Sequence, residues 1–171
     1  MSDVNNARPR VIVADPDPET SALLARQLEW AGYAVMVAGN GRDALDLITR
    51  MRPAAVVLEV TMERLTGYEV VRQLREDERN RRMPVIMISA RAGKLDRDFA
   101  FTVGADEYVK KPFLSSDLVA KLAMLVPSPT GTKPPAPTAP ETSPKPMARP
   151  ARRSAAPVTR RPLTPVPALS R

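Results

Sequence analysis

Five short apolar runs recur along the first two thirds of the 171-residue chain, and they constrain its fold more than any other feature. They cover residues 11–14, 34–38, 55–60, 85–89 and 108–110. The segments AAVVL and VIMI are unbroken rather than alternating, which is typical of strands covered by helices on both faces. The runs therefore predict a parallel sheet.

Helical patterns fill the intervals between these runs. Their apolar residues are Leu24, Leu28 and Ala31, then Ala44, Leu45, Ile48 and Met51, then Val70, Val71 and Leu74, then Phe101 and Val103, and finally Leu118, Leu122 and Leu125. Gly32 and Gly104 follow two of these segments, where a left-handed helix cap needs glycine. Five alternations of strand and helix predict a doubly wound α/β fold with right-handed crossovers. Ligand chemistry in such a fold gathers at the carboxyl ends of the strands.

Composition divides the chain after residue 126. Residues 1–126 hold 18 Lys and Arg against 18 Asp and Glu, whereas residues 127–171 hold 8 against 1 and carry 13 of the 19 prolines. The tail has too few apolar residues to offset the entropy lost on ordering, so we expect it to be disordered. Its arginine doublets could contact nucleic acid weakly, an acidic protein or an anionic membrane surface, or the tail could be a spacer.

Two residue types are missing altogether. The chain has no cysteine and no histidine. Disulfides, zinc–thiolate sites and imidazole bases are therefore excluded, and with them the usual hydrolase triads. The chain lacks a secretory signal pattern and a membrane-spanning apolar run, so we expect a cytoplasmic protein with a flexible start at residues 1–9.

Polar side chains follow four of the five predicted strands. They are Asp15 and Asp17 after the first strand, with Pro16 between them, Glu59 at the end of the third, Ser89 at the end of the fourth, and Lys111 before Pro112 after the fifth. The carboxyl ends of parallel strands share one edge, which predicts that acids, a hydroxyl and an amine meet there. Such a cluster could bind a divalent cation or stabilise a phosphoryl group.

Four segments carry a family resemblance. VIVADPDPE, VVLEVTMERLTGYEV, PVIMISA and GADEYVKKPF, in this order and spacing, resemble the receiver domain of bacterial two-component response regulators. The resemblance covers residues 10–126, and the tail has no counterpart in it. It implies a flavodoxin-like sheet with strand order 2-1-3-4-5 and five helices.

The resemblance also implies a site. In the family an aspartate at the end of the third strand accepts a phosphoryl group from a kinase histidine and, with an acidic pair after the first strand, holds Mg²⁺. A lysine before a proline, whose peptide bond is usually cis, neutralises the acyl phosphate, and a hydroxyl after the fourth strand hydrogen-bonds it. By position, Asp15, Ser89, Lys111 and Pro112 match.

Three positions depart from the family pattern. Glu59 replaces the acceptor aspartate, Pro16 replaces the second acid, and Glu63 replaces a loop proline. The glutamate carboxylate reaches about 1.5 Å further, and displacements of about 1 Å can cost on the order of a hundredfold in rate. Pro16 has no side-chain oxygen for a hard cation. Both changes impair phosphotransfer.

The longer side chain could instead carry a permanent negative charge toward Lys111 and Ser89. We expect an ion pair between Glu59 and Lys111, because a partly buried lysine without a partner would be costly. The sequence then predicts an atypical, stand-alone receiver biased toward one conformation, which acts as an interaction module and not as an enzyme, with no cofactor. Two alternatives remain. The site could still be phosphorylated to some extent, or it could have lost its function, with Glu59 serving only as the ion-pair partner of Lys111.

Other residues carry secondary predictions. Asp15, Asp17 and Glu59 could still hold Mg²⁺ weakly, although Asp17 also suits a helix N-cap. Tyr108 matches the family's aromatic switch, whose ring turns inward when the hydroxyl residue, here Ser89, shifts.

Partner contacts are expected on the face formed by the fourth helix, fifth strand and fifth helix. Phe99 and Tyr108 are the candidate contacts there, and Phe101 is expected in the core. Trp30 lies off its apolar stripe. Symmetric pairing of two copies through this face is common in the family and stays open for this chain.

Overall fold

The computed structural model describes residues 8–91 and 93–127, where strands and helices alternate five times. The elements are β1 (Arg10–Ala14), α1 (Pro18–Trp30), β2 (Ala34–Ala38), α2 (Gly41–Met51), β3 (Ala55–Glu59), α3 (Gly67–Glu76), β4 (Val85–Ser89), α4 (Lys94–Val103), β5 (Glu107–Lys110) and α5 (Ser115–Leu125). All strand pairs are parallel, in the order β2-β1-β3-β4-β5. The predicted flavodoxin-like fold is therefore confirmed.

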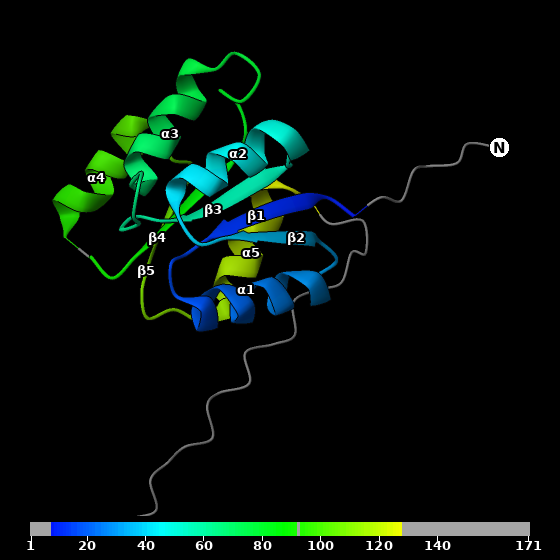
Figure 1. The fold of residues 1–171 in the computed structure, drawn as a ribbon. Helices are drawn as coiled ribbons and strands as arrows, with labels where there is room; N and C mark the ends of the chain where they lie inside the picture. Colours follow the sequence, from blue (N-terminus) through cyan, green and yellow to red (C-terminus); the bar gives the residue numbers. More distant parts are fainter. Residues whose placement is uncertain (1–7, 92, 128–171) are drawn as a thin grey trace, which may run out of the picture. The chain divides into compact units, whose positions relative to one another are not determined.

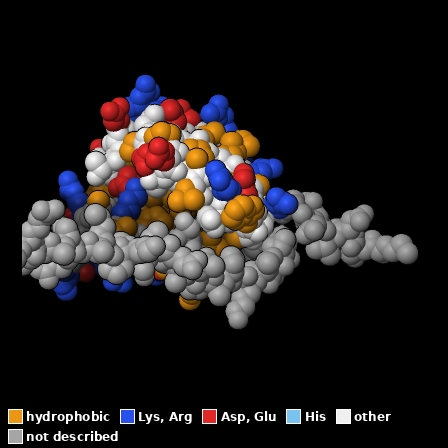
Figure 2. Space-filling view, turned by 90° about the horizontal axis from the view of Figure 1, so that it is seen from below, with side chains coloured by type: hydrophobic (Ala, Val, Ile, Leu, Met, Phe, Trp, Pro, Cys, Tyr) orange, Lys and Arg blue, Asp and Glu red, His pale blue; other side chains and the backbone are white. Residues whose placement is uncertain are grey.

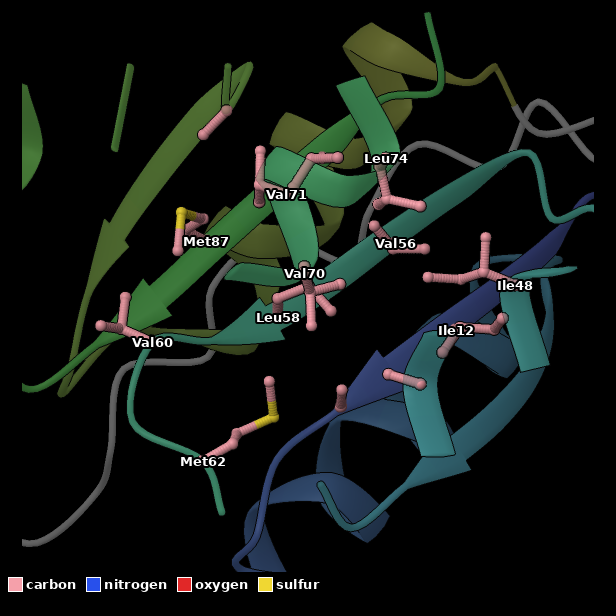
Figure 3. Close-up of a cluster of buried hydrophobic side chains, with 14 of the residues drawn as sticks. Ile12, Ile48, Val56, Leu58, Val60, Met62, Val70, Val71, Leu74 and Met87 are labelled. Carbon is pink, nitrogen blue, oxygen red and sulfur yellow. The ribbon is translucent and has the colours of Figure 1, made fainter. Parts of the chain in front are cut away.

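The helices cover both faces of the sheet, with α1 and α5 on one side and α2, α3 and α4 on the other (Figure 1). This is why the apolar runs do not alternate, since β3 and β4 are buried at every position. Apolar side chains of α2 and α3, such as Ile48, Val70 and Leu74, pack on one face of the sheet (Figure 3). On the other face, Leu28 of α1 and Leu122 of α5 lie in a second buried cluster.

Local signals set the ends of several helices. Asp17 caps α1 by accepting hydrogen bonds from the amides of Glu19 and Thr20. Thr66 and Glu69 form a reciprocal capping box at the start of α3. Gly104 ends α4 with a φ of 108°, the left-handed conformation that the sequence predicts for it.

The expectation that Phe101 lies in the core is wrong. Ala100 is the fully buried residue of α4, whereas Phe101 is 39% exposed and lies beneath the Arg97 guanidinium. Neighbouring helix positions differ by about 100°, so the side chain next to the buried position turns away from the sheet. Trp30 is exposed, as its place off the α1 stripe indicates.

Seen from the side of α1 and α5, exposed apolar side chains lie among charged ones (Figure 2). Within residues 8–91 and 93–127, no helix has both the length and the apolar character needed to cross a bilayer. The predictions for a flexible start at 1–9 and a tail at 127–171 fall almost wholly outside the described residues, and so stay predictions.

Candidate functional site

The sheet brings four of the predicted site residues to one edge. Asp15 directly follows β1, Glu59 ends β3, Ser89 ends β4, and Lys111 directly follows β5. Because β1, β3, β4 and β5 are consecutive neighbours, their carboxyl ends lie side by side. Asp15, Glu59 and Ser89 are buried, and the Lys111 side chain is 24% exposed.

Lys111 connects the two buried carboxylates. Its Nζ lies 2.6 Å from Glu59 Oε2 and 2.6 Å from Asp15 Oδ2. The ion pair with Glu59 agrees with the sequence-based expectation, while the equally short contact with Asp15 was not foreseen. The ammonium therefore lies between two carboxylates.

Backbone amides bind the remaining carboxylate oxygens. Asp15 Oδ1 accepts a hydrogen bond of 2.9 Å from the Asp17 amide, and Glu59 Oε1 accepts one of 3.1 Å from the Thr61 amide. Each carboxylate thus divides its two oxygens between the amine and the backbone. This arrangement satisfies buried charge that would otherwise be costly.

The pKa of Lys111 is raised. Burial alone lowers it, but hydrogen bonds and charge attraction from Asp15 and Glu59 together outweigh that effect. The amine consequently stays charged throughout the physiological pH range. Because it is charged, this one amine can form ion pairs with both buried acids.

This raised pKa predicts a loss of stability in strong alkali. The pair contributes fully below the ordinary lysine pKa of 10.5, and the contribution disappears as pH rises through the higher pKa of the folded state. Urea unfolding of wild type and Lys111→Met should show a stability difference that is constant up to about pH 10 and shrinks above it. A difference that persists unchanged in stronger alkali would contradict this assignment.

The donor set does not fit Mg²⁺. Asp15 and Glu59 each direct an oxygen at the lysine amine, and Pro16 offers no side-chain oxygen. Asp17 turns toward α1, where hydrogen bonds from the Thr20 side chain and the Glu19 backbone lower its pKa. In the described part of the chain, no three acidic side chains gather in a way that could hold a metal ion. The lysine ammonium takes the position between the two buried acids that a cation would need.

The two predicted switch residues meet at Arg91. Ser89 Oγ accepts a hydrogen bond of 3.0 Å from the Arg91 amide, and the hydroxyl of the buried Tyr108 donates one of 2.7 Å to the Arg91 carbonyl. Among the described residues, the Ser89 hydroxyl makes no hydrogen bond with the Glu59 or Lys111 side chain, and Ser89 meets Lys111 only through its backbone carbonyl, which accepts a hydrogen bond of 2.7 Å from the Lys111 amide. The expected approach of Glu59 to Ser89 is therefore not seen. Arg91 was missed because its backbone, not its side chain, makes both contacts.

Phe99 lies half exposed on α4. Its ring packs edge-on against Tyr68 of α3, with centroids 4.8 Å apart and an interplanar angle of 77°. Leu95, one helical turn earlier, is 84% exposed. The contact with Tyr68 was not expected, since a contact between helices leaves no local pattern in the sequence. The Lys111–Pro112 peptide bond is cis, as the resemblance implies.

The 2-1-3-4-5 sheet with acids, a hydroxyl and a lysine at its carboxyl edge defines a flavodoxin-like domain of the signalling type. The chain belongs to the response regulator receiver domain family, which it matches over residues 11–123. It is 42% identical over 117 residues to the response regulator MprA of Mycolicibacterium vanbaalenii, covering 68% of this chain and 50% of that protein. The chain therefore spans about half the length of this curated relative.

Solved structures show the same likeness. The receiver domain of the Francisella response regulator 1452 is 30% identical, with a TM-score of 0.65, covering 69% of this chain and 96% of that domain. The Vibrio cholerae chemotaxis protein CheY4 is 26% identical, with a TM-score of 0.67, covering 70% and 100%. The receiver domain of the sensor histidine kinase PA1611 from Pseudomonas aeruginosa is 27% identical, with a TM-score of 0.65, covering 70% and 98%, and carries a magnesium ion in its active site cleft.

Proposed function

We propose that this chain is an atypical receiver that works as a protein-interaction module in phosphorelay-type signal transduction. In this proposal Glu59 is a permanent, partial substitute for a phosphorylated aspartate. The observation that carries it is the contact of 2.6 Å between the buried Glu59 carboxylate and Lys111 Nζ, at the position where the family's phosphoacceptor would stand.

The substitution is partial for reasons of charge and shape. A carboxylate brings one negative charge and two oxygens, whereas a phosphoryl group brings about −1.5 to −2 and three oxygens. Here one Glu59 oxygen binds Lys111 and the other binds the Thr61 amide, while the Ser89 hydroxyl binds the Arg91 amide and not Glu59. We therefore expect a conformational bias and not full activation.

The position of Tyr108 also supports a bias toward the signalling conformation. Its ring is buried and its hydroxyl is bound to the Arg91 carbonyl, and the family associates an inward ring with the signalling state. A change of state would reach partners through the face of α4, β5 and α5. Phe99 stays a candidate contact because it is half exposed, although its ring packs against Tyr68 of α3. The domain would bind a protein there and convert no substrate, and the basic tail would tune access or location in the cytoplasm.

Residual phosphoacceptor activity is the second candidate. It is favoured by the solved receiver with magnesium in its cleft and by the intact Asp15 and Lys111 of this chain. Two features argue against it. Both Glu59 oxygens are already bound, one to Lys111 and one to the Thr61 amide, and Pro16 has no side-chain oxygen for a metal ion. The two functions make opposite predictions for chemical labelling.

The test compares wild type with a Pro16→Asp, Glu59→Asp double variant, each incubated with acetyl phosphate and Mg²⁺. We expect no mass increase in wild type and a gain of one phosphate in the double variant. With beryllofluoride, the amide NMR signals of Ser89 and Tyr108 should shift only in that variant. Glu59→Gln is the matched control, since it removes the charge at nearly constant size and should move the same signals without any phosphoryl analogue. Mg²⁺-dependent labelling of wild type would refute the proposal in favour of the second candidate.

A further inference from the structure

Arginines gather at the edge of the sheet opposite the Glu59 site. They lie at or just before the starts of the strands β1, β3 and β4, and are Arg8, Arg10, Arg50, Arg52, Arg79, Arg81 and Arg82. These three strands are parallel neighbours, so their amino ends lie together. The acids in the same connections are Glu76, Asp77 and Glu78. Positive charge is thus in excess at this edge.

A pocket of about 620 Å³ opens between the connection from α2 to β3 and the connection from α3 to β4. Arg52, Arg79 and Arg82 line it, and all three are exposed. Pro53 and Met83, both buried, give it apolar walls. Its volume falls in the range of about 300 to 1,000 Å³ that is typical of small-molecule sites.

These three guanidinium groups have no structural partner. Within the described residues, the side chains of Arg52, Arg79 and Arg82 make no hydrogen bond and no ion pair. Arg75, in the same region, is the contrast, because its guanidinium binds the Gly104 and Met83 carbonyls and the Asp106 carboxylate. Arg75 therefore holds the fold together, whereas the pocket arginines are free to bind a ligand.

The acid that lines the pocket is already engaged. Asp77 accepts hydrogen bonds from the Arg79 amide at 3.0 Å and from Asn80 Nδ2 at 2.6 Å. Its carboxylate stabilises the turn after α3, and its one charge cannot neutralise three arginines. The pocket keeps a positive excess.

Arg52 also occupies an unfavourable backbone conformation. It caps α2 with a φ of 46° and a ψ of 66°, in the left-handed region that favours glycine. For a residue with a side chain, the left-handed conformation costs about 1–2 kcal/mol. Non-glycine residues in such conformations cluster at functional sites.

We propose that this pocket is a second ligand site, which binds a small molecule carrying two or more adjacent phosphate groups. Guanidinium groups bind phosphate oxygens in pairs, and three of them match the several negative charges of an oligophosphate better than the single charge of a carboxylate. The apolar walls could hold the uncharged part of a nucleotide. Inorganic oligophosphate and nucleotides share the recognised chemistry.

Two other occupants fit less well. A nucleic acid strand usually needs aromatic side chains for stacking, and no aromatic residue is among the described residues that line the pocket. The chain's own tail at 127–171 carries 8 basic residues against 1 acidic residue, so an arginine pocket would repel it. A small anion remains the best match for both size and charge.

Calorimetric titration of the full chain with pyrophosphate, ADP, ATP and AMP tests the proposal. The double variant Arg79→Ala, Arg82→Ala should bind di- and triphosphates about tenfold or more weakly, because hydrogen bonds to charged groups are lost. The matched control is Arg26→Ala, Arg97→Ala, which removes the same charge from α1 and α4 and should leave the affinity unchanged. Weak binding through the tail is common to all variants and does not separate them.

A second variant removes any ambiguity about folding. Arg52→Gly deletes a guanidinium while relieving the left-handed backbone, so it should weaken binding with no loss of thermal stability. Tighter binding of ADP than of pyrophosphate would identify a nucleotide site, and equal binding would identify an oligophosphate site; both support the proposal. Absence of binding to wild type, an equal loss in the control variant, or binding only to a short DNA duplex would overturn it.

Discussion

Replacing Lys111 with methionine should lower the free energy of unfolding by about 3 kcal/mol, since removing one partner of a buried ion pair leaves uncompensated charge. Asp15 and Glu59 would then face each other with no cation between them, and their side chains are only 1% and 8% exposed. Methionine keeps most of the lysine's length, so packing changes little. Urea unfolding measured at neutral pH gives the number directly.

The matched control is Lys94→Met. Lys94 pairs with Asp98 along α4, but their side chains are 89% and 54% exposed. Such surface pairs contribute at most about 1 kcal/mol, and helical ones usually about half of that. Equal losses in the two variants would show that Lys111 does not hold the acids together.

Gly41→Ala should cost about 3 kcal/mol, at the upper end of the range for an added core methyl group. A Cβ at Gly41 would lie 2.1 Å from the backbone oxygen of Leu65 and 2.8 Å from its carbonyl carbon. Both contacts are with backbone, so the loop between β3 and α3 would have to move. That loop leaves the sheet at Glu59, so we also expect amide NMR shifts at Thr61.

Gly39→Ala provides the control two residues away. A Cβ at Gly39 meets no atom within 4 Å. Its free energy of unfolding should therefore stay within about 0.5 kcal/mol of wild type. If the two alanine variants were equally stable, the contact between the start of α2 and the loop after β3 would be looser than the structure describes.

Much of the fold could be predicted because its signals are local or periodic. The unbroken apolar runs of β3 and β4 indicated burial on both faces, and they are buried at every position. The predicted strands match the observed ones within a residue at their ends. The gathering of Asp15, Glu59 and Lys111 followed from parallel topology alone, which places the carboxyl ends of neighbouring strands together.

Side-chain choices within the site could not be predicted in the same way. Glu59 was expected to reach both Lys111 and Ser89, but its second oxygen binds the Thr61 amide, and Ser89 binds the Arg91 amide. Which of several donors a carboxylate selects depends on rotamer and distance, and neither is encoded in spacing. The prediction that Phe101 lies in the core was wrong for a related reason. Two apolar residues near the end of a helix do not reveal which of them faces the sheet.

Under the proposed function, the Glu59–Lys111 contact has a consequence for timing. A phosphoryl group arrives and hydrolyses, so it gives a signal a beginning and an end. A glutamate built into the chain has neither a donor nor a half-life. The output of such a protein would follow its cellular abundance, and synthesis and degradation would replace kinase and phosphatase as its controls.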